Sequence, residues 1–319
     1  MGMNPERESA AAVYGDLLAE ILVRLPAKSL TRSKLVCKHW LSVISGDEFR
    51  RRYTLHGPKP PASLLLQTRT SKFFHIKPFD KKPILVPYKF RLPNPKIKIL
   101  SSCNGLMLLE SESHLRTDYY VHNPTTNQSR RIVLDYCEDY PDIMALSLAF
   151  DPSKSLHYTI VLVRGALKSP DYNDRRQRIF RVEVYDSESC IWEKGSEPFT
   201  ASAELKFSSG VHCNGLIYWK SSWYYYDIGK KTMATLRFSD LAWCDELDGD
   251  GDGDGVCVFG STSSLVLDRS GKIKGCSFGD DESMKELVDL RDQPFYNNRD
   301  YVDFASHNVH LFQETLAPT

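Results

Sequence analysis

Aspartates alternate with glycines between positions 248 and 255, and the residue types of this stretch suggest ion binding. Carboxylate oxygens are preferred ligands of Ca²⁺, but a helix–loop–helix calcium site also needs a bidentate glutamate at the twelfth position of its loop. Counted from Asp248, that position holds Phe259, and no helical pattern flanks the run. We therefore predict an acidic loop between two strands in preference to a specific ion site.

The eight cysteines are the second group with possible chemistry. None lies in a C-x-x-C pair and their spacing is irregular, whereas a secreted disulfide framework is denser. Cys213 beside His212, and the pair His307 and His310, are suggestive groupings, but neither has the spacing of a four-ligand zinc site. We predict reduced thiols that are mostly buried as small apolar groups, with no metal and no cofactor.

Lysines are interleaved with prolines and aromatic residues between positions 72 and 98. This combination could stack on single-stranded nucleic acid, but lysines also protect exposed strand edges from pairing, and we favour the edge. The sequence contains no G-x-S-x-G elbow, no Gly-rich phosphate loop before a helix and no H-E-x-x-H motif. We therefore predict a non-catalytic protein that binds no nucleic acid.

The elements that would position any site begin with a short helical region over 14–53. Its apolar residues recur at one-, three- and four-residue steps and form a broad helical stripe: Leu17, Leu18, Ile21, Leu22 and Leu25. Pro26 should end that helix because it lacks an N–H and crowds the preceding turn. A second helix is predicted over 28–35, a third from near Cys37, and a last helical turn after Asp47.

Three short helices in about forty residues cannot bury all of this apolar surface internally. One interpretation is a helical cap packed on the rest of the chain. The other is a docking module whose remaining apolar face is covered by another protein. The pattern alone leaves both open.

Three runs in this region resemble the F-box of plant F-box proteins: DLLAEIL at 16–22, RLPAKSL at 24–30 and VCKHW at 36–40. The resemblance implies binding to a Skp-type adaptor, which links the chain to a cullin-based ubiquitin ligase, the SCF complex. It also implies an adaptor-binding face and a helical core, without dividing the residues between them: Leu17, Ile21, Leu25, Pro26, Leu30, Val36 and Trp40.

The chain departs from this family pattern at two places. Val13 and Tyr14 stand where the family usually has Leu-Pro, and Ser33 stands where it usually has a large apolar residue. Loss of a buried Phe-sized group typically costs about 3–5 kcal/mol, and less at a half-exposed site, so these departures would weaken adaptor binding.

Beyond a stiff linker at 54–61, the pattern changes to short strand-like runs that end at Asn-Gly, Asp-Pro, Gly or Ser. The predicted strands are Ser63–Gln67, Ile97–Ser101, Leu106–Glu110, Tyr119–His122, Arg131–Leu134, Leu146–Phe150, Tyr158–Arg164, Ile179–Tyr185, Ile191–Lys194, Phe207–Val211, Leu216–Trp219, Trp223–Asp227, Met233–Phe238, Val256–Phe259, Ser264–Leu267 and Ile273–Cys276. Many short strands without long helices between them predict an antiparallel all-β sandwich, barrel or propeller.

An internal repeat favours the propeller. SCNGL at 102–106 is echoed by HCNGL at 212–216, and in both copies Asn-Gly, a strong hairpin signal, precedes an apolar strand and then a Tyr-rich strand. Repeated hairpin units indicate radial stacking of small sheets, although the spacing leaves the number of blades open.

The same region resembles the F-box-associated β-propeller domain of plants. The matching pieces include NPTT at 123–126, LAFDP at 148–152, VEVYD at 182–186 and NGLIYW at 214–219, and the resemblance extends from about Leu100 to Phe238. It implies an α+β multidomain chain with a tail at 1–12, a small three-helix F-box at 13–53 and an all-β, propeller-like domain at 62–319 that holds a target protein.

The charge balance is neutral, with 41 Lys and Arg against 41 Asp and Glu, which argues against a general nucleic-acid binder. No apolar run approaches a membrane span, and the first residues lack a secretory signal, so we expect a cytoplasmic and/or nuclear location. The predicted function is the substrate-recognition subunit of an SCF-type ubiquitin ligase. The alternatives are an F-box-like propeller binding protein that does not enter a ligase, and a propeller enzyme with a metal or cofactor in its channel.

Overall fold

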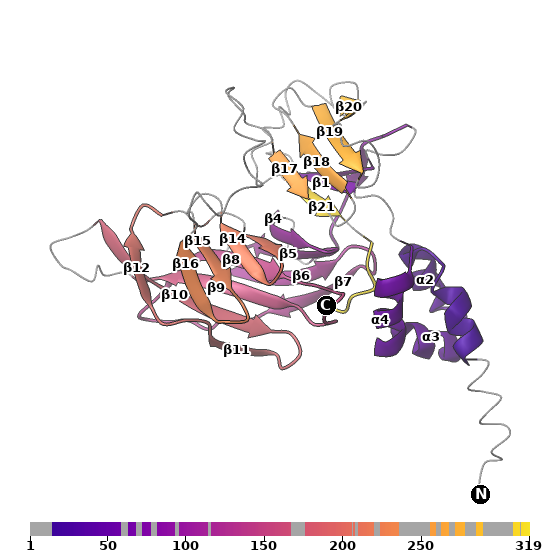
Figure 1. The fold of residues 1–319 in the computed structure, drawn as a ribbon, viewed down its shortest axis with the longest axis horizontal. Helices are drawn as coiled ribbons and strands as arrows, with labels where there is room; N and C mark the ends of the chain where they lie inside the picture. The colour runs from indigo at the N-terminus through magenta and orange to yellow at the C-terminus, as the bar shows by residue number, and fades with distance from the viewer. Residues whose placement is uncertain are drawn as a thin grey trace, which may run out of the picture.

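The computed structural model describes most of the chain as a helical unit followed by β-sheets (Figure 1). The described residues are 15–58, 63–67, 72–77, 82–92, 96–113, 116–166, 176–205, 207, 210–219, 224–235, 256–259, 263–267, 272–277, 285–289, 309–312 and 314–319. The acidic run at 248–255, His307 and the two residues in place of the family's Leu-Pro lie outside them.

Four helical segments form the first unit within the described residues. Residues 15–22 are helical, and α2 (Ala27–Ser33), α3 (Lys38–Ser45) and α4 (Asp47–His56) follow. Pro26 separates the first two segments, as the sequence predicts, and is the N-cap residue of α2 with φ −58° and ψ 147°. The sequence predicts three helices and a single last turn, whereas α4 is a helix of ten residues. Its first turn carries Asp47 and Glu48, which suit the positive end of the helix dipole.

The helical unit has its own hydrophobic core. Leu22 and Leu30 pack with Ile44, Phe49 and Tyr53, and all five side chains are buried. Phe49 and Tyr53 lie one turn apart on α4, and their rings stack with centroids 6.3 Å apart. This buried aromatic pair explains why the region after Asp47 continues as a helix instead of ending after one turn.

Antiparallel strands build the remainder, as predicted, and they form five sheets within the described residues. The first sheet holds β21 (Val309–Phe312), β1 (Ser63–Gln67), β2 (Phe73–Ile76) and β3 (Val86–Tyr88). The second holds β4 (Lys96–Cys103), β5 (Leu106–Glu112), β6 (Thr117–Asn123) and β7 (Gln128–Ile132). The third holds β8 (Asp142–Ala149), β9 (Thr159–Gly165), β10 (Gln177–Asp186), β11 (Ile191–Lys194) and β12 (Phe199–Ser202), which pairs with β10.

The fourth sheet holds β13 (Val211–Cys213), β14 (Leu216–Trp219), β15 (Tyr224–Asp227) and β16 (Thr232–Thr235). The fifth holds β17 (Val256–Phe259), β18 (Ser263–Leu267), β19 (Lys272–Ser277) and β20 (Lys285–Asp289). The predicted strand over 207–211 is wrong in its placement, because β13 runs from Val211 to Cys213. β2, β3, β12, β20 and β21 have no counterpart among the predicted strands.

Neighbouring sheets share apolar cores. Leu108 of β5 packs in one cluster with Leu148 of β8 and Ile160 of β9, which joins the second and third sheets. Val163 of β9 packs in another cluster with Trp219 of β14, which joins the third and fourth sheets. One edge strand of each sheet lies beside an edge strand of another: β4 beside β8 and β21, β13 beside β8, and β17 beside β21.

Two Asn-Gly hairpins have the geometry that the repeat predicts. Asn104 and Gly105 have φ values of 44° and 89° and connect β4 to β5, while Asn214 and Gly215 have φ values of 51° and 84° and connect β13 to β14. Positive φ at both central residues matches the right-handed twist of the flanking strands, and Asn and Gly tolerate it best.

Candidate functional site

The seven residues that sequence reasoning assigned to the adaptor-binding face and helical core separate into two groups. Leu17, Ile21, Pro26 and Val36 are exposed to solvent. Leu30 is fully buried. Leu25 and Trp40 are half-buried and pack against the helical core. Three of the seven thus support the helical unit from inside, and four are exposed.

Large apolar side chains remain exposed on the helical unit. The exposed fractions are 56% for Leu17, 64% for Ile21, 87% for Leu35, 62% for Val36 and 47% for Leu41. We call these five residues, which lie between positions 17 and 41, the exposed apolar set; Leu55 of α4 is also exposed, at 55%. The first helix is apolar on two sides, because Leu22 and Val23 face the core while Leu17 and Ile21, four residues apart, share an outer face.

Leu35 and Val36 lie beyond the end of α2, which stops at Ser33 with Lys34 as its C-cap. The Leu35 N–H donates to the Arg32 carbonyl at 3.0 Å, and the Val36 N–H donates to the Ser33 carbonyl at 3.1 Å. These short turns satisfy the backbone locally while both side chains stay in water. Sequence reasoning missed Leu35 as a site residue because it placed that residue inside the second helix, although its position beside Val36 was a usable signal.

The β-domain also exposes apolar residues in the segment that joins β7 to β8. Tyr136 is 81% exposed and Val133 is exposed beside it. Two side chains of the β-sheet hold the backbone of this segment. Arg164 Nη2 donates to the Asp135 carbonyl at 2.7 Å, and Trp192 Nε1 donates to the Val133 carbonyl at 2.9 Å. Single exposed apolar residues are normal on protein surfaces, so this segment alone identifies no binding site.

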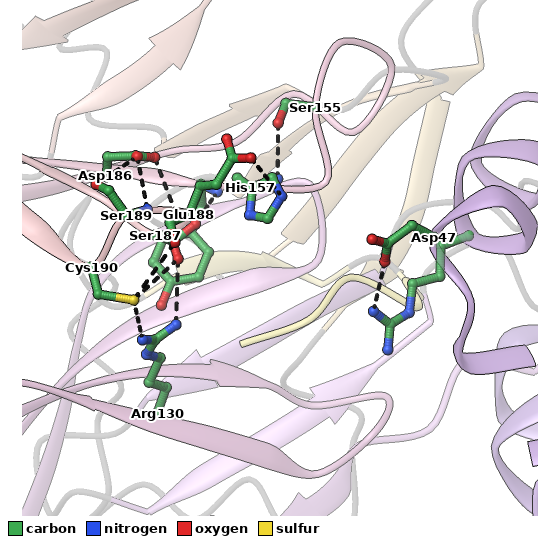
Figure 2. A network of polar contacts seen from close by, with 11 residues as sticks. Asp47, Arg130, Ser155, His157, Asp186, Ser187, Glu188, Ser189 and Cys190 are labelled. Carbon is green, nitrogen blue, oxygen red and sulfur yellow. Dashed lines mark hydrogen bonds and ion pairs between the residues drawn. The ribbon is translucent and has the colours of Figure 1, made fainter. Parts of the chain in front are cut away.

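A polar network connects β7, the segment before β9 and the turn between β10 and β11 (Figure 2). Arg130 of β7 donates through Nη2 to Cys190 Sγ at 2.8 Å and through Nη1 to the Ser187 carbonyl at 3.5 Å. Ser187 Oγ accepts the Tyr158 N–H at 2.7 Å, and Asp186 accepts two N–H groups of its own turn. These contacts fix the hairpin between β10 and β11 against its neighbours, and His157 Nε2 lies 3.9 Å from Glu188 Oε1 of the same turn.

Within the described residues, Cys103 and His212 bring a thiol close to an imidazole, as in a catalytic pair. Cys103 Sγ lies 3.6 Å from His212 Nδ1 and 3.2 Å from the Phe150 carbonyl. Burial raises the pKa of Cys103 to about 12 and lowers the pKa of His212. The thiol therefore stays protonated at neutral pH, whereas a nucleophilic cysteine needs a lowered pKa.

The remaining cysteines correct one prediction. Cys37, Cys190 and Cys213 are exposed and Cys103 and Cys137 are half-buried, so the prediction of mostly buried cysteines is wrong for the described residues. All five are free thiols, as predicted. Among the described residues no three His, Cys, Asp or Glu side chains are grouped to hold a metal ion. In the same part of the chain, no helix has the length and apolar character needed to cross a membrane.

Comparison with known proteins assigns both parts of the chain. Residues 16–52 match the F-box domain family, and residues 72–238 match the family described as the F-box associated beta propeller domain. The helical unit with its exposed apolar set, followed by antiparallel sheets, therefore defines an F-box protein. The chain belongs to the F-box proteins that carry an F-box associated domain, which confirms both resemblances.

Its relatives include F-box proteins of a plant. An F-box protein of Arabidopsis thaliana is 31% identical over 230 residues, which covers 68% of this chain and 54% of the relative. A second Arabidopsis F-box protein is 27% identical over 206 residues, which covers 64% of this chain and 52% of that relative. The chain thus spans about half the length of these curated relatives. A solved chain from a nidogen–laminin complex covers 71% of this chain and 77% of its own length at 13% identity, but its TM-score of 0.36 is too low to carry an argument.

Proposed function

We propose that this chain is the substrate-recognition subunit of an SCF-type ubiquitin ligase. The F-box would dock a Skp-type adaptor and through it a cullin, and the β-domain would bind a target protein. The observation that carries this proposal is the exposed apolar set, because five large apolar side chains on so small a unit remain uncovered by the chain's own β-domain. Exposed apolar surface of this kind is typical of protein-binding sites.

The chain would act by proximity and perform no bond chemistry itself. Holding a target beside a loaded ubiquitin-transfer enzyme converts an encounter in solution into an effectively intramolecular step. The chain's own titratable pair, Cys103 and His212, has the wrong protonation for nucleophilic catalysis. A cytoplasmic and/or nuclear location is part of the same proposal.

The proposed adaptor-binding residues are the exposed apolar set together with Pro26. Leu25, Leu30 and Trp40 would act from inside, by holding the helices in the arrangement that presents these side chains. This division refines the prediction from sequence, which named core and surface residues together.

The β-domain is proposed to be a propeller of five blades. The edge strands β4, β8, β13, β17 and β21 would surround its axis. Ring closure would come from β21, which pairs antiparallel with β1 in the register Ser63 to Phe312 although the two strands are far apart in the sequence. Such pairing of late and early strands leaves few sheet edges exposed, which supports this arrangement.

Capture of a purified Skp-type adaptor by the purified chain tests the proposal. The variant Ile21→Asp with Leu35→Asp should lose capture but keep its thermal midpoint, because both side chains already contact water. Val133→Asp, at a comparably exposed position of the β-domain, is the matched control and should capture normally. Failure of the unaltered chain to capture the adaptor would contradict the ligase assignment.

Ser33 supports a second candidate function, an F-box-like binding protein outside any ligase. Its hydroxyl donates to the Ser29 carbonyl at 3.0 Å, so this position adds a satisfied polar group to the surface where the resemblance implies a large apolar residue. The variant Ser33→Phe separates the two candidates. A large gain in adaptor capture over a weak starting level would favour the second.

A further inference from the structure

Residues 314–317 lie between the F-box and the β-domain and contact both. Leu316 is buried in the hydrophobic core of the helical unit with Leu22 and Ile44. The next residue, Ala317, is buried in the core that joins the second and third sheets. Figure 1 shows this stretch in yellow between α4 and β7. Two consecutive side chains thus belong to the cores of two different domains.

Asn123, at the end of β6, holds this stretch from the β-domain side. Its Nδ2 donates to the Thr315 carbonyl at 3.2 Å and to the Ala317 carbonyl at 2.8 Å, and the residue is fully buried. The Thr315 N–H in turn donates to Thr125 Oγ1 at 3.2 Å. A buried amide that satisfies two carbonyls fixes the backbone direction of the stretch as well as its position.

Three equivalent turns show that this amide has a role beyond its own turn. Asn123, Asp186 and Asp227 each end a strand, and each accepts backbone N–H groups from the following residues. Each turn closes with a residue at positive φ, as at Cys190 and Lys231. An aspartate therefore serves the turn as well as an asparagine does. Only the amide can also donate, and in Asn123 both donated bonds go to residues 315 and 317.

The F-box side adds an ion pair to the apolar contact. Lys28 Nζ of α2 lies 3.6 Å from Glu314 Oε1, and the lysine is half exposed, so the pair contributes little by itself. Glu314 also lies near Tyr53 of α4: burial first, and the Glu314 charge second, raise the pKa of Tyr53 to about 12.

We propose that residues 314–317 form an interdomain clasp, in which Leu316 and Asn123 are positioning residues that fix the F-box against the β-domain. A second connection, in addition to the chain between α4 and β1, restricts rotation of one domain about the other. This consequence for ubiquitin transfer rests on the proposed function, because transfer depends on the orientation of a bound target as well as on its proximity.

The distance distribution between spin labels tests the clasp directly. Labels are placed on the exposed thiols Cys37 of the F-box and Cys213 of the β-domain, in a full-length variant whose other cysteines are replaced. The unaltered clasp should give one narrow distance. Asn123→Asp keeps the side-chain oxygen that accepts the N–H groups of its own turn, but it replaces the Nδ2 donor by an oxygen that faces the carbonyls of residues 315 and 317. The distribution of distances between the labels should therefore become broad. Asp227→Asn, in an equivalent turn, is the matched control and should stay narrow.

Leu316→Ala removes the apolar contact between the clasp and the F-box core, and it should also broaden the distance distribution. This variant keeps the test decisive if circular dichroism shows that Asn123→Asp folds poorly. Narrow distributions in both variants, or a broad one in the unaltered chain, would overturn the clasp. Adaptor capture is measured on the unlabelled chains, because a label on Cys37 would lie beside Val36 of the exposed apolar set. Its loss in the unaltered, unlabelled chain contradicts the proposed function and leaves the distance result valid.

The positioning role has its own readout in a reconstituted ligase. With adaptor capture unchanged, the lysines of the β-domain that become ubiquitinated, mapped by mass spectrometry, should change in number and location when the clasp is broken. An unchanged lysine pattern in a variant with a broad distance distribution would remove the positioning role.

Discussion

Leu35→Ala should weaken adaptor binding without destabilising the fold. Leu35 is 87% exposed and its N–H is bonded to its own turn, so the folded chain loses little when the side chain is shortened, within about 0.5 kcal/mol. Burying a whole leucine side chain contributes about 1.5–3 kcal/mol, and nearly all of that is available to a partner at this position. We expect a loss of about 2 kcal/mol in binding free energy, which corresponds to a Kd about thirty-fold higher.

Titration calorimetry with the purified adaptor measures this effect, and two valines provide a matched pair. Val36 is 62% exposed on the F-box and Val211 is 61% exposed on β13, so the same truncation removes a similar exposed surface from each. Val36→Ala should raise the Kd and Val211→Ala should not. A Kd for Leu35→Ala within about twofold of the unaltered chain, or equal effects at the two valines, would refute the assignment of the exposed apolar set.

Three further predictions concern the β-domain. Burial lowers the pKa of His122 from 6.5 to about 4, so between these pH values the unfolded chain binds a proton that the folded chain does not. The free energy of unfolding should therefore fall by about 3 kcal/mol as the pH drops from about 6.5 to about 4. His122→Gln should make the free energy of unfolding, measured by urea titration, less dependent on pH over this range. Gly215→Ala should lower the free energy of unfolding by about 1 kcal/mol because of its φ of 84° alone, since no neighbouring atom would contact the added methyl group. Gly229→Ala is the control, because Gly229 has no positive φ, and it should leave the thermal midpoint nearly unchanged. Arg164→Met should lower the free energy of unfolding by about 2 kcal/mol, because it breaks a buried 3.1 Å pair with Glu183 and leaves that carboxylate with Arg181 as a partner. Adding Glu183→Met should recover part of that loss; no recovery would place the cost in the Asp135 contact of Arg164 or in the lost Arg181 pair.

Local signals predicted the features that neighbouring residues determine. Pro26 separates two helices because a missing N–H and a steric clash act within one turn. The hairpins at Asn104-Gly105 and Asn214-Gly215 follow from the φ values that only a few residue types tolerate. Most of the described strands were predictable for the same reason, since alternation and β-branched residues are properties of five or six consecutive positions, whereas β2, β3, β12, β20 and β21 were missed.

Features that depend on distant packing were not predictable in this way. Leu30 and Val36 look alike in the sequence, but one is fully buried and the other is exposed, and the difference arises only when α3 and α4 cover one side of α2. The length of α4 depends on Phe49 and Tyr53 reaching the core past a run of arginines that suggests solvent. The pairing of β21 with β1 brings together short runs from the two ends of the described β-domain, and no local rule selects that partner.

The helical unit resolves its surplus of apolar surface in two ways at once. Leu316 closes the core from another part of the chain, so the packing of the F-box includes a residue that follows the β-strands. The exposed apolar set stays in water. The two sequence interpretations, a cap on the chain and a docking module for a partner, are therefore compatible, since each describes different residues of the same helical unit. Because Leu316 would fix the orientation of the helices that carry Leu35, a partner bound at Leu35 and a target bound on the sheets would be held in a defined relative orientation, which residues 314–317 would set.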